Sequence, residues 1–481
     1  MATRTPAHTT PATTKTTKTT ATYHFPPGPK GLPVVGNLPQ FQRDPLAFIE
    51  GVHRAYGPIA TVHMLSQPVV FTFRPEHAYD LLVERARLVG VGERPGLRRR
   101  LGASLLTTDG ATHRRQRRLV QPAFHRKRVE GYAEIMTSQT TEMLNRWHIG
   151  EELDIAAELR ELTLRVIVKA LFDLDLAEEG TRLSQVFAAV VEAQPSGFGA
   201  MIPDALLDLP FMPGHAARDA VRAAATDLDA FVYGLIAQRR AEGVDHGDVL
   251  SMLLAARDED GQPLSDVEVR DQTMTLIVAG HETTFTALSW TLDLLSRRSD
   301  AYARLRSEVA DVLQGRVPRA ADLPNLPYLD AVIQESLRLR PPAWSINRVP
   351  FEPFELDGYQ LPAGTPLIVS PWILHHSPDL WEHAEEFRPE RWLDGSTKSL
   401  PRGVYFPFGL GPRICIGMPL AEMEMRLVLA TILQQVMPVV VPGFRPIPRP
   451  RVTLRLANGL RVRIGPAGAM LQPPADADLT A

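Results

Sequence analysis

Cysteine is almost absent from this chain, which has a single one, Cys415, in 481 residues. One cysteine forms no internal disulfide and leaves no set of thiolates for an iron–sulfur cluster. The thiol is therefore structural, reactive or a metal ligand. The lack of disulfides is compatible with a reducing compartment, and we expect the protein in the cytoplasm.

Long apolar runs and strong net charge are also lacking. No run of apolar residues is long enough to span a bilayer, so we expect no membrane anchor. The formal net charge of −3 gives no reason to expect a nucleic-acid partner. Residues 1–22 are rich in threonine, contain no acidic residue and lack the apolar core of a secretory signal. We predict a disordered tail there, with a transit peptide as the alternative.

The remaining composition is that of an ordinary soluble globular protein, with 44% hydrophobic and 22% charged residues. From 75 to about 430 the periodicity is mostly helical. Short strands are expected as a hairpin over 59–73, in the stretch 350–369, and as a second hairpin around the Asn-Gly pair of 452–464. We predict one mainly α domain with small peripheral β-sheets over 23–464, followed by a flexible tail over 465–481.

The lone cysteine lies in the segment Phe408-Gly-Leu-Gly-Pro-Arg-Ile-Cys-Ile-Gly417. Gly411 and Gly417 permit a tight loop close to a flat ligand. Arg413 places a cation near the thiol, and the helix expected from Met418 onward points its N-terminal amides at it; both favour the thiolate. The alternative is a buried, inert cysteine.

The spacing Phe-x-x-Gly-x-Arg-x-Cys-x-Gly resembles the heme-binding loop of the cytochrome P-450 family. The resemblance implies the cytochrome P-450 fold, with heme b as cofactor and Cys415 as the axial iron ligand. It places Phe408, Arg413 and Gly417 in the cofactor-binding loop. In this family the thiolate pushes electron density to the iron and favours O–O cleavage.

A second motif is Ala279-Gly280-His281-Glu282-Thr283-Thr284, inside an apolar stretch. Unpaired polar groups in a buried helix cost about 1–3 kcal/mol each. A threonine can avoid this cost by bonding a carbonyl one turn earlier and bending the helix, which leaves a structural role open. The run is similar to the family's acid–alcohol motif, which implies that Glu282 and Thr283 are catalytic and deliver protons during oxygen activation. Gly280 would give room for the bend.

A third motif pairs Glu335 with Arg338, three residues apart on one helix face. Alone this is a surface ion pair of little consequence. Pro389-Glu390-Arg391-Trp392 follows further along, where the family has Pro-Glu-Arg-Phe. The resemblance implies a buried structural network of Glu335, Arg338 and Arg391 that supports the heme-binding loop.

A fourth motif is the basic run 112–118, for which a nucleic-acid site and a solvated helix face are the general readings. The resemblance instead implies that His113 and Arg117 bind heme propionates, together with Arg348 and Arg413, because guanidinium groups bind carboxylates bidentately. We expect the outward basic residues to dock an acidic electron donor. These residues are Arg114, Arg115, Arg118, Arg126 and Lys127.

The substrate pocket is expected between the central helix, the loops over 91–106 and 193–214, and the stretch after Arg338. Helical spacing places Thr275 and Ala279 on the face of Thr283. The two loops resemble the variable lid regions of the family. The pocket candidates are Leu105, Thr275, Ala279, Ala343, Trp344 and Ile346, with a simple core role open for Ala343 and Ile346.

The resemblance, carried by four motifs in order, implies a soluble, bacterial-type heme-thiolate monooxygenase. It would insert one oxygen atom from O2 into a hydrophobic small molecule, by hydroxylation or epoxidation. The expected substrates are terpenoid, polyketide or fatty-acid-like. Electrons would come from a ferredoxin and its NAD(P)H-dependent reductase, or from a flavodoxin-type donor, and we expect a monomer. The alternatives are a heme-thiolate peroxygenase or isomerase, a non-catalytic heme sensor and, least favoured, a nucleic-acid-binding protein.

Overall fold

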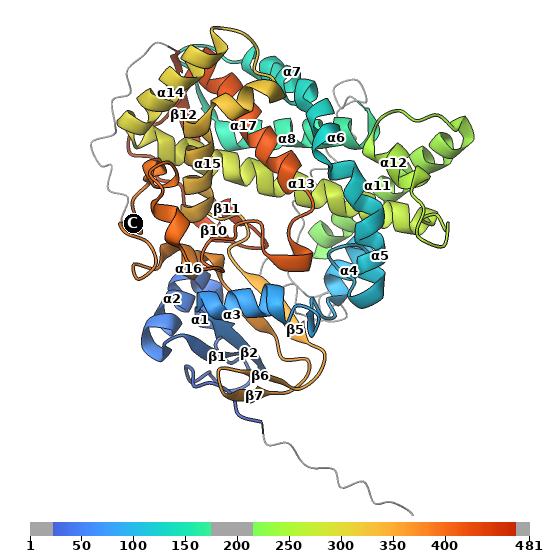
Figure 1. Cartoon of the computed structure of the whole chain (residues 1–481), viewed down its shortest axis with the longest axis vertical. Helices are drawn as coiled ribbons and strands as arrows, with labels where there is room; N and C mark the ends of the chain where they lie inside the picture. Colours follow the sequence, from blue (N-terminus) through green and yellow to red (C-terminus); the bar gives the residue numbers. More distant parts are fainter. Residues whose placement is uncertain (1–22, 175–214, 468–481) are drawn as a thin grey trace, which may run out of the picture.

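A computed structural model describes residues 23–174 and 215–467. The terminal segments predicted as tails lie largely outside these ranges, as does the lid loop expected over 193–214. Helices form most of this described part, which also contains four small sheets, and strands β1, β2, β6 and β7 lie together at one end of the molecule (Figure 1). The predicted mainly α fold with small peripheral sheets is confirmed.

The longest helix, α13 (Asp266–Ser296), crosses the middle of the helical body. It begins with a capping box in which Ser265 and Glu268 exchange side-chain-to-backbone hydrogen bonds, satisfying two amides of the first turn. Helices α8 (Ile155–Phe172), α15 (Pro327–Leu339) and α17 (Met418–Gln435) pack against it. Their apolar side chains share one large core.

The other helices surround this centre. They are α1 (Leu38–Arg43), α2 (Pro45–Tyr56), α3 (Pro75–Tyr79), the π-helix η1 (Asp80–Glu84), α4 (Pro95–Leu101), α5 (Gly110–Val120), α6 (Arg126–Gly131), α7 (Ala133–Leu144), α11 (His215–Glu242), α12 (Val249–Ala255), α14 (Ser299–Leu313) and α16 (Pro371–His376). Short 3-10 turns are η2 (Gln121–Phe124), η4 (Ala320–Asn325), η5 (Pro389–Trp392), η6 (Ser396–Ser399) and η7 (Gly411–Arg413). None of these described helices is both long and apolar enough to cross a membrane.

The largest sheet has the order β1-β2-β8-β5-β3, built from β1 (Ile59–Met64), β2 (Gln67–Thr72), β8 (Leu367–Val369), β5 (Ile346–Pro350) and β3 (Val89–Gly90). The β1–β2 hairpin matches the pairing predicted over 59–73. The other sheets are β4 (Glu152–Asp154) with β12 (Arg461–Pro466) and β9 (Val436–Val440), β6 (Phe354–Leu356) with β7 (Tyr359–Leu361), and β10 (Pro448–Pro450) with β11 (Leu454–Leu456).

The hairpin predicted over 452–464 is wrong, because its two strands belong to different sheets. Strand β11 pairs with β10, whereas β12 pairs with β4 and β9. The Asn458 amide instead ties the turn backward, accepting from the Ile447 N–H and donating to the Arg445 carbonyl. Gly459 is required because a Cβ there would lie 2.2 Å from a carboxylate oxygen of Asp154. The Asn-Gly pair is thus a link between two sheets.

Glu424 on α17 is buried, and no hydrogen bond reaches its Oε1 within the described residues. Burial raises the pKa of its carboxyl from 4.5 to about 8. Between these pH values only the unfolded chain loses the proton, so the folded state loses stability as pH rises. Glutamine does not ionise, so the unfolding free energy of Glu424→Gln should not fall in this way. We expect the difference in unfolding free energy between the variant and the wild type to grow, in favour of the variant, by about 1.4 kcal/mol for each pH unit in this window. Denaturant titrations from pH 5 to 8 measure this difference, and a difference that does not change with pH contradicts the assignment.

Candidate active site

The cysteine loop connects η7 to α17 and is closed by its own backbone. The Cys415 N–H donates to the Phe408 carbonyl at 2.9 Å, and the Ile414 N–H donates to the Gly411 carbonyl at 3.0 Å. Gly411 has a φ of +68°, and a Cβ there would lie 1.9 Å from the Leu82 carbonyl oxygen of η1. Gly411 is therefore needed for contact with η1, and this contact fixes the start of the loop.

The Cys415 side chain is accessible although protein atoms surround it closely, so it lies in a recess of the structure. Burial raises the pKa of the thiol, while the N–H groups of Gly417 and Met418 and the charge of Arg117 lower it. A metal ion bound to such a thiol takes it as the thiolate, and these three groups stabilise that charge. The expected helix from Met418 onward is present as α17, with its first amides at the sulfur.

Arg413 has a different contact from the one expected. Its guanidinium forms an ion pair with Asp109 and donates to the Thr108 carbonyl, so it faces the start of α5. The cation that acts on the thiol is Arg117, which donates to the Ile414 carbonyl at 2.8 Å. Chain proximity suggested Arg413, but the fold brings a residue from α5 to the sulfur.

The central helix offers one accessible face. From Val269 to Ser296 every residue is buried except Ala279, Gly280 and Thr283. Their spacing places these three residues on one side of α13. The face combines small side chains with one hydroxyl, so it leaves room beside the helix for a bulky apolar ligand.

Thr283 and Glu282 make separate contacts. The Thr283 hydroxyl donates to the Ala279 carbonyl at 2.7 Å, as the structural alternative expected. The Glu282 carboxylate is buried and accepts from Arg455 Nε and Nη2, each at 2.7 Å, and from the Thr453 hydroxyl. Glu282 is thus held by the segment around β11, and the structure shows no hydrogen bond between the acid and the alcohol.

Gly280 lies inside α13, whose helical backbone runs without interruption from Asp266 to Ser296. A Cβ at Gly280 would lie 3.1 Å from Cδ1 of Ile167 on α8. The residue therefore permits close packing of α8 on α13. Next to it, the buried His281 hydrogen-bonds Thr163 of α8 at 2.9 Å through Nδ1, and burial lowers the pKa of this imidazole to about 3.

The predicted propionate-binding residues lie near one another, and each affects the charge state of another. Burial, together with Arg413 and Arg117, lowers the pKa of His113 to about 4, so the imidazole is neutral at neutral pH. Burial and Arg413 lower the pKa of Arg348 to about 10. Arg117 and Arg348 bond only backbone carbonyls, and neither has an ion pair among the residues that the structure describes. Two guanidinium groups without an ion pair among the described residues, that of the buried Arg348 and that of the half-buried Arg117, fit the two propionates of heme b.

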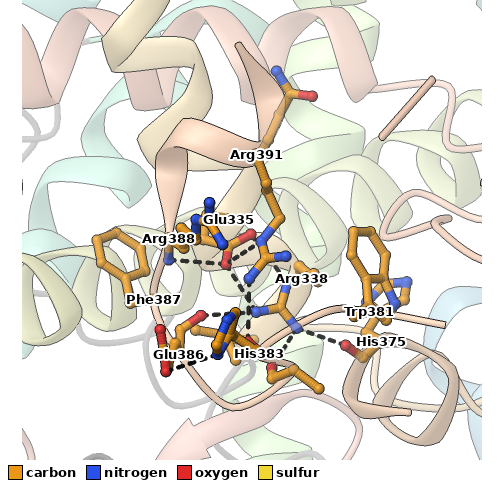
Figure 2. A network of polar contacts seen from close by, with 12 residues as sticks. Glu335, Arg338, His375, Trp381, His383, Glu386, Phe387, Arg388 and Arg391 are labelled. Carbon is orange, nitrogen blue, oxygen red and sulfur yellow. Dashed lines mark hydrogen bonds and ion pairs between the residues drawn. The ribbon is translucent and has the colours of Figure 1, made fainter. Parts of the chain in front are cut away.

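Glu335, Arg338 and Arg391 form the network that the sequence predicted them to share (Figure 2). Glu335 and Arg338 have no exposed surface. The Glu335 carboxylate accepts from Arg338 Nε at 3.0 Å and Nη2 at 2.8 Å, and from Arg391 Nε at 3.0 Å. Arg338 also donates to the carbonyls of His375 and Ala384, each at 2.7 Å. The network therefore joins α15 to α16 and to the segment before η5.

Trp392 also belongs to this network, through its indole N–H group, although the sequence suggested only an apolar role for its ring. Its indole N–H donates to Glu335 Oε2 at 2.9 Å. The Arg388 N–H donates to Glu335 Oε1 at 3.0 Å. The carboxylate thus has five donors in all, and a phenylalanine at 392 would supply one fewer.

The pocket candidates divide into two groups. Ala279, Ala343 and Ile346 are partly accessible, and Ile346 lies over the cysteine loop, with its Cδ1 3.8 Å from the Cβ position of Gly409. The other three, Leu105, Thr275 and Trp344, are buried.

Trp344 requires a correction. Its ring belongs to the hydrophobic cluster of the N-terminal sheet, 6.4 Å from Phe41, and its N–H donates to the Arg451 carbonyl. The prediction that Trp344 lines the pocket is therefore wrong.

The outward basic residues are less available than expected. Arg115 forms ion pairs with Asp258 and Glu268, Arg118 with Glu259, and Arg126 with Glu130. Such pairs neutralise most of the positive surface predicted to attract an acidic electron donor. Arg114 and Lys127 remain exposed.

Sequence reasoning missed four residues that hold the site together: Thr453 and Arg455, which bind Glu282, and Thr108 and Asp109, which bind Arg413. Asp109 also accepts from the N–H groups of Val91 and Gly92. Thr453 is 171 residues from Glu282 in the sequence, and Asp109 is 304 residues from Arg413. Because these partners are so far apart, no local sequence spacing reveals them.

Comparison with known proteins agrees with this geometry. The sequence model of the family described as Cytochrome P-450 matches residues 26–453. Cyclooctatin synthase from Streptomyces melanosporofaciens is 38% identical over 432 residues, covering 89% of this chain and 92% of the relative. Cyclooctat-9-en-7-ol 5-monooxygenase from the same organism is 35% identical, covering 92% and 94%. Pentalenene oxygenase from Streptomyces avermitilis is 34% identical, covering 91% and 96%.

The fold comparison gives the same family. The solved structure of retinoic acid bound cyanobacterial CYP120A1 superposes with a TM-score of 0.83 at 29% identity, covering 92% of this chain and all of that one. The accessible Cys415 thiol and the buried Glu335 network therefore lie in a protein of known family, as do Arg117 and Arg348, which have no ion pair in the described part of the chain. The chain belongs to the cytochrome P-450 family, and it is a heme-thiolate monooxygenase with heme b as its cofactor.

Proposed function

We propose that this monooxygenase hydroxylates a terpenoid, with electrons from a ferredoxin and its NAD(P)H-dependent reductase. Two relatives carry names that denote an unsaturated alcohol and an alkene as substrates. The accessible face of Ala279, Gly280 and Thr283 supports an apolar substrate, because it offers small side chains and a single hydroxyl. We further propose one catalytic domain over 23–464 that acts as a cytoplasmic monomer.

The observation that carries the mechanism is the place of the Cys415 thiol, beside the N–H groups of Gly417 and Met418 and near Arg117. Once bound, heme supplies the oxygen chemistry, and thiolate ligation favours O–O cleavage. The chain's part is to hold that thiolate, and the Gly417 and Met418 amides with Arg117 do so. Arg117 and Arg348 would hold the propionates, and the Glu335 network fixes the segment that leads into the loop.

Proton delivery is the task we propose for Thr283 and Glu282. The Thr283 hydroxyl lies on the accessible face, and once it releases the Ala279 carbonyl it can donate to a bound ligand while its oxygen accepts from water. Glu282 has both oxygens occupied by Arg455 and Thr453, so a proton that passes through this carboxylate requires the ion pair to open. The side chain of Arg455 is 21% exposed, which makes it the point where solvent reaches this pair.

Thr283→Ala tests the hydroxyl against a matched control. We expect the variant to keep its heme but to lose coupled product formation at least about tenfold, with the electrons released as peroxide, because general acid–base groups contribute 10²–10⁴-fold. Thr284→Ala is the control, because Thr284 makes the same bond to a carbonyl, that of Gly280 at 2.8 Å, but is buried. Product and peroxide yields per NADPH are measured, and a fully coupled Thr283→Ala would refute the role.

The proposed reaction is tested by reconstitution with ferredoxin, reductase and NADPH on a panel of cyclic terpenoids. Mass spectrometry under ¹⁸O2 should find one labelled oxygen atom in the product. Turnover with peroxide alone, without NADPH, would favour a peroxygenase. Substrate rearrangement without labelled oxygen would favour an isomerase, and NADPH use that no substrate stimulates would favour a sensor.

A further inference from the structure

The outer side of α5 carries two exposed arginines, Arg114 and Arg118. Residues four apart lie on one face of a helix, so the two guanidinium groups can bind the same partner. Between them, Arg117 points to the cysteine loop and donates to the Ile414 carbonyl at 2.8 Å. A protein that binds Arg114 and Arg118 therefore lies beside the helix that contacts the cysteine loop.

An acidic loop, residues 257–263 between α12 and α13, lies against this helix. Its shape is fixed by its own hydrogen bonds. The Asp258 carboxylate accepts from the N–H groups of Asp260 at 3.1 Å and Gln262 at 2.8 Å, and the Asp258 N–H donates to the Gln262 carbonyl at 3.0 Å. The acidic loop is thus a tight turn that does not need α5 to hold its form.

Arg115 fastens the acidic loop to α5. Its guanidinium donates to Asp258 at 2.6 Å, to Glu268 at 2.7 Å and to the Pro263 carbonyl at 3.2 Å. These three acceptors come from both ends of the acidic loop and from the first turn of α13. Arg115 is therefore a structural clip, and its charge is not free for a partner protein.

Glu259 covers the outer arginine that the clip leaves exposed. It forms an ion pair with Arg118, although the two side chains are 76% and 59% exposed. Such an exposed pair is weak, because water and salt screen it and two long side chains must be held in place. A hollow of about 290 Å³, lined by Glu259, Arg118 and Asp260, lies between the acidic loop and α5. A carboxylate from a partner protein can therefore displace Glu259 from Arg118.

The neighbouring charges lack this contact. Asp260 is exposed next to Glu259, and it has no ion pair among the residues that the structure describes. Arg114 is exposed as well and has no ion pair in the same ranges. The chain thus offers one covered and one uncovered arginine, and one covering and one non-covering acid, within a few residues of each other.

We propose that Glu259 competes with the acidic electron donor for Arg118, so that docking requires the donor to displace it. This inference rests on the proposed ferredoxin. A strongly acidic donor with carboxylates for both Arg114 and Arg118 replaces Glu259, whereas a weakly acidic protein meets a helix whose positive charge is largely neutralised. The acidic loop therefore selects the donor at the cost of a slower encounter.

The covering of Arg118 is tested without any donor, by phenylglyoxal labelling of arginines in the holoenzyme and peptide mass spectrometry. Glu259→Gln is compared with Asp260→Asn, which removes the same charge from the same loop but leaves the ion pair. We expect Arg118 to react at least about twofold faster in Glu259→Gln, with Arg114 reacting equally in both variants as the internal reference. Equal labelling of Arg118 in the two variants overturns the proposal.

The competition is tested by stopped-flow reduction under CO with a pre-reduced, acidic [2Fe–2S] ferredoxin. At about 10 mM ionic strength we expect Glu259→Gln to be reduced at least about threefold faster than Asp260→Asn. The difference should disappear at about 1 M salt and in the Arg118→Gln background, because Arg118 is then screened or absent. Equal rates at low ionic strength overturn the proposal. Neither readout needs oxygenated product, so a failure of the proposed terpenoid oxidation is seen separately.

Discussion

Cys415→Ser is expected to abolish the thiolate signature of the ferrous–CO complex and to reduce monooxygenase turnover to background. Serine has nearly the size of cysteine, so the loop closed by the Cys415 N–H and the Phe408 carbonyl should form as before. The hydroxyl is not ionised at neutral pH, and it cannot push electron density to the iron as a thiolate does. Residual heme, held by the propionate-binding residues, should give a spectrum without thiolate character.

Ile416→Val is the matched control for this change, because it alters the neighbouring, partly buried side chain and keeps the sulfur. Its ferrous–CO spectrum and turnover should remain close to those of the wild type. Retention of a thiolate-type CO band in Cys415→Ser would contradict the assignment directly, since the chain contains no second cysteine.

Glu335→Gln is expected to have the second largest effect, by preventing stable folding around the heme. The substitution keeps the shape of the side chain but removes the charge that Arg338 and Arg391 share. Two buried arginines are then left without a counter-charge, and breaking one partner of a buried pair costs about 3–5 kcal/mol. This is a large part of the stability of a typical protein, about 5–15 kcal/mol. We expect poor soluble yield and little bound heme.

Glu386→Gln controls for the loss of a carboxylate in the same region. Glu386 is exposed, and only its backbone carbonyl bonds Arg338, at 3.0 Å. This variant should keep its heme content and unfold within about 0.5 kcal/mol of the wild type. Equal stability of Glu335→Gln and Glu386→Gln in denaturant would show that the network does not support the loop.

The sequence was most informative where one local segment carries its own chemistry. The loop from Phe408 to Gly417 needs its glycines, its cysteine and the helix that follows, all within a few residues. The hairpin over 59–73 likewise follows from local alternation and a turn. In both cases the interactions that determine the structure join residues close together in the sequence, so the sequence pattern alone predicted the loop and the hairpin.

Contacts between distant segments were not predictable in the same way. We expected Arg413 to stabilise the thiolate because it lies two residues from Cys415 in the sequence. Its ion pair is instead with Asp109, which is 304 residues away in the sequence. Glu282 was expected to act with Thr283, but Arg455 holds it. Which of several nearby charges an arginine binds depends on tertiary packing, and the spacing of residues along the chain does not encode it.

The predicted pairing of the strands near the C-terminus was wrong for a related reason. An Asn-Gly pair between alternating segments favours a hairpin, and the local preference was correct for a turn. Strand β12 nevertheless pairs with β9 and β4, because pairing there buries Val462 and Ile464. The free energy of burial in the tertiary fold exceeds the preference of a two-residue turn.

The central claim is a bond between the sulfur of Cys415 and the heme iron. X-ray absorption at the iron edge of the reconstituted holoenzyme tests it most directly, because the nearest shell reports the ligand element. The account predicts one sulfur scatterer beside the porphyrin nitrogens, and its loss in Cys415→Ser. A shell of nitrogen and oxygen alone in the wild-type protein would contradict it.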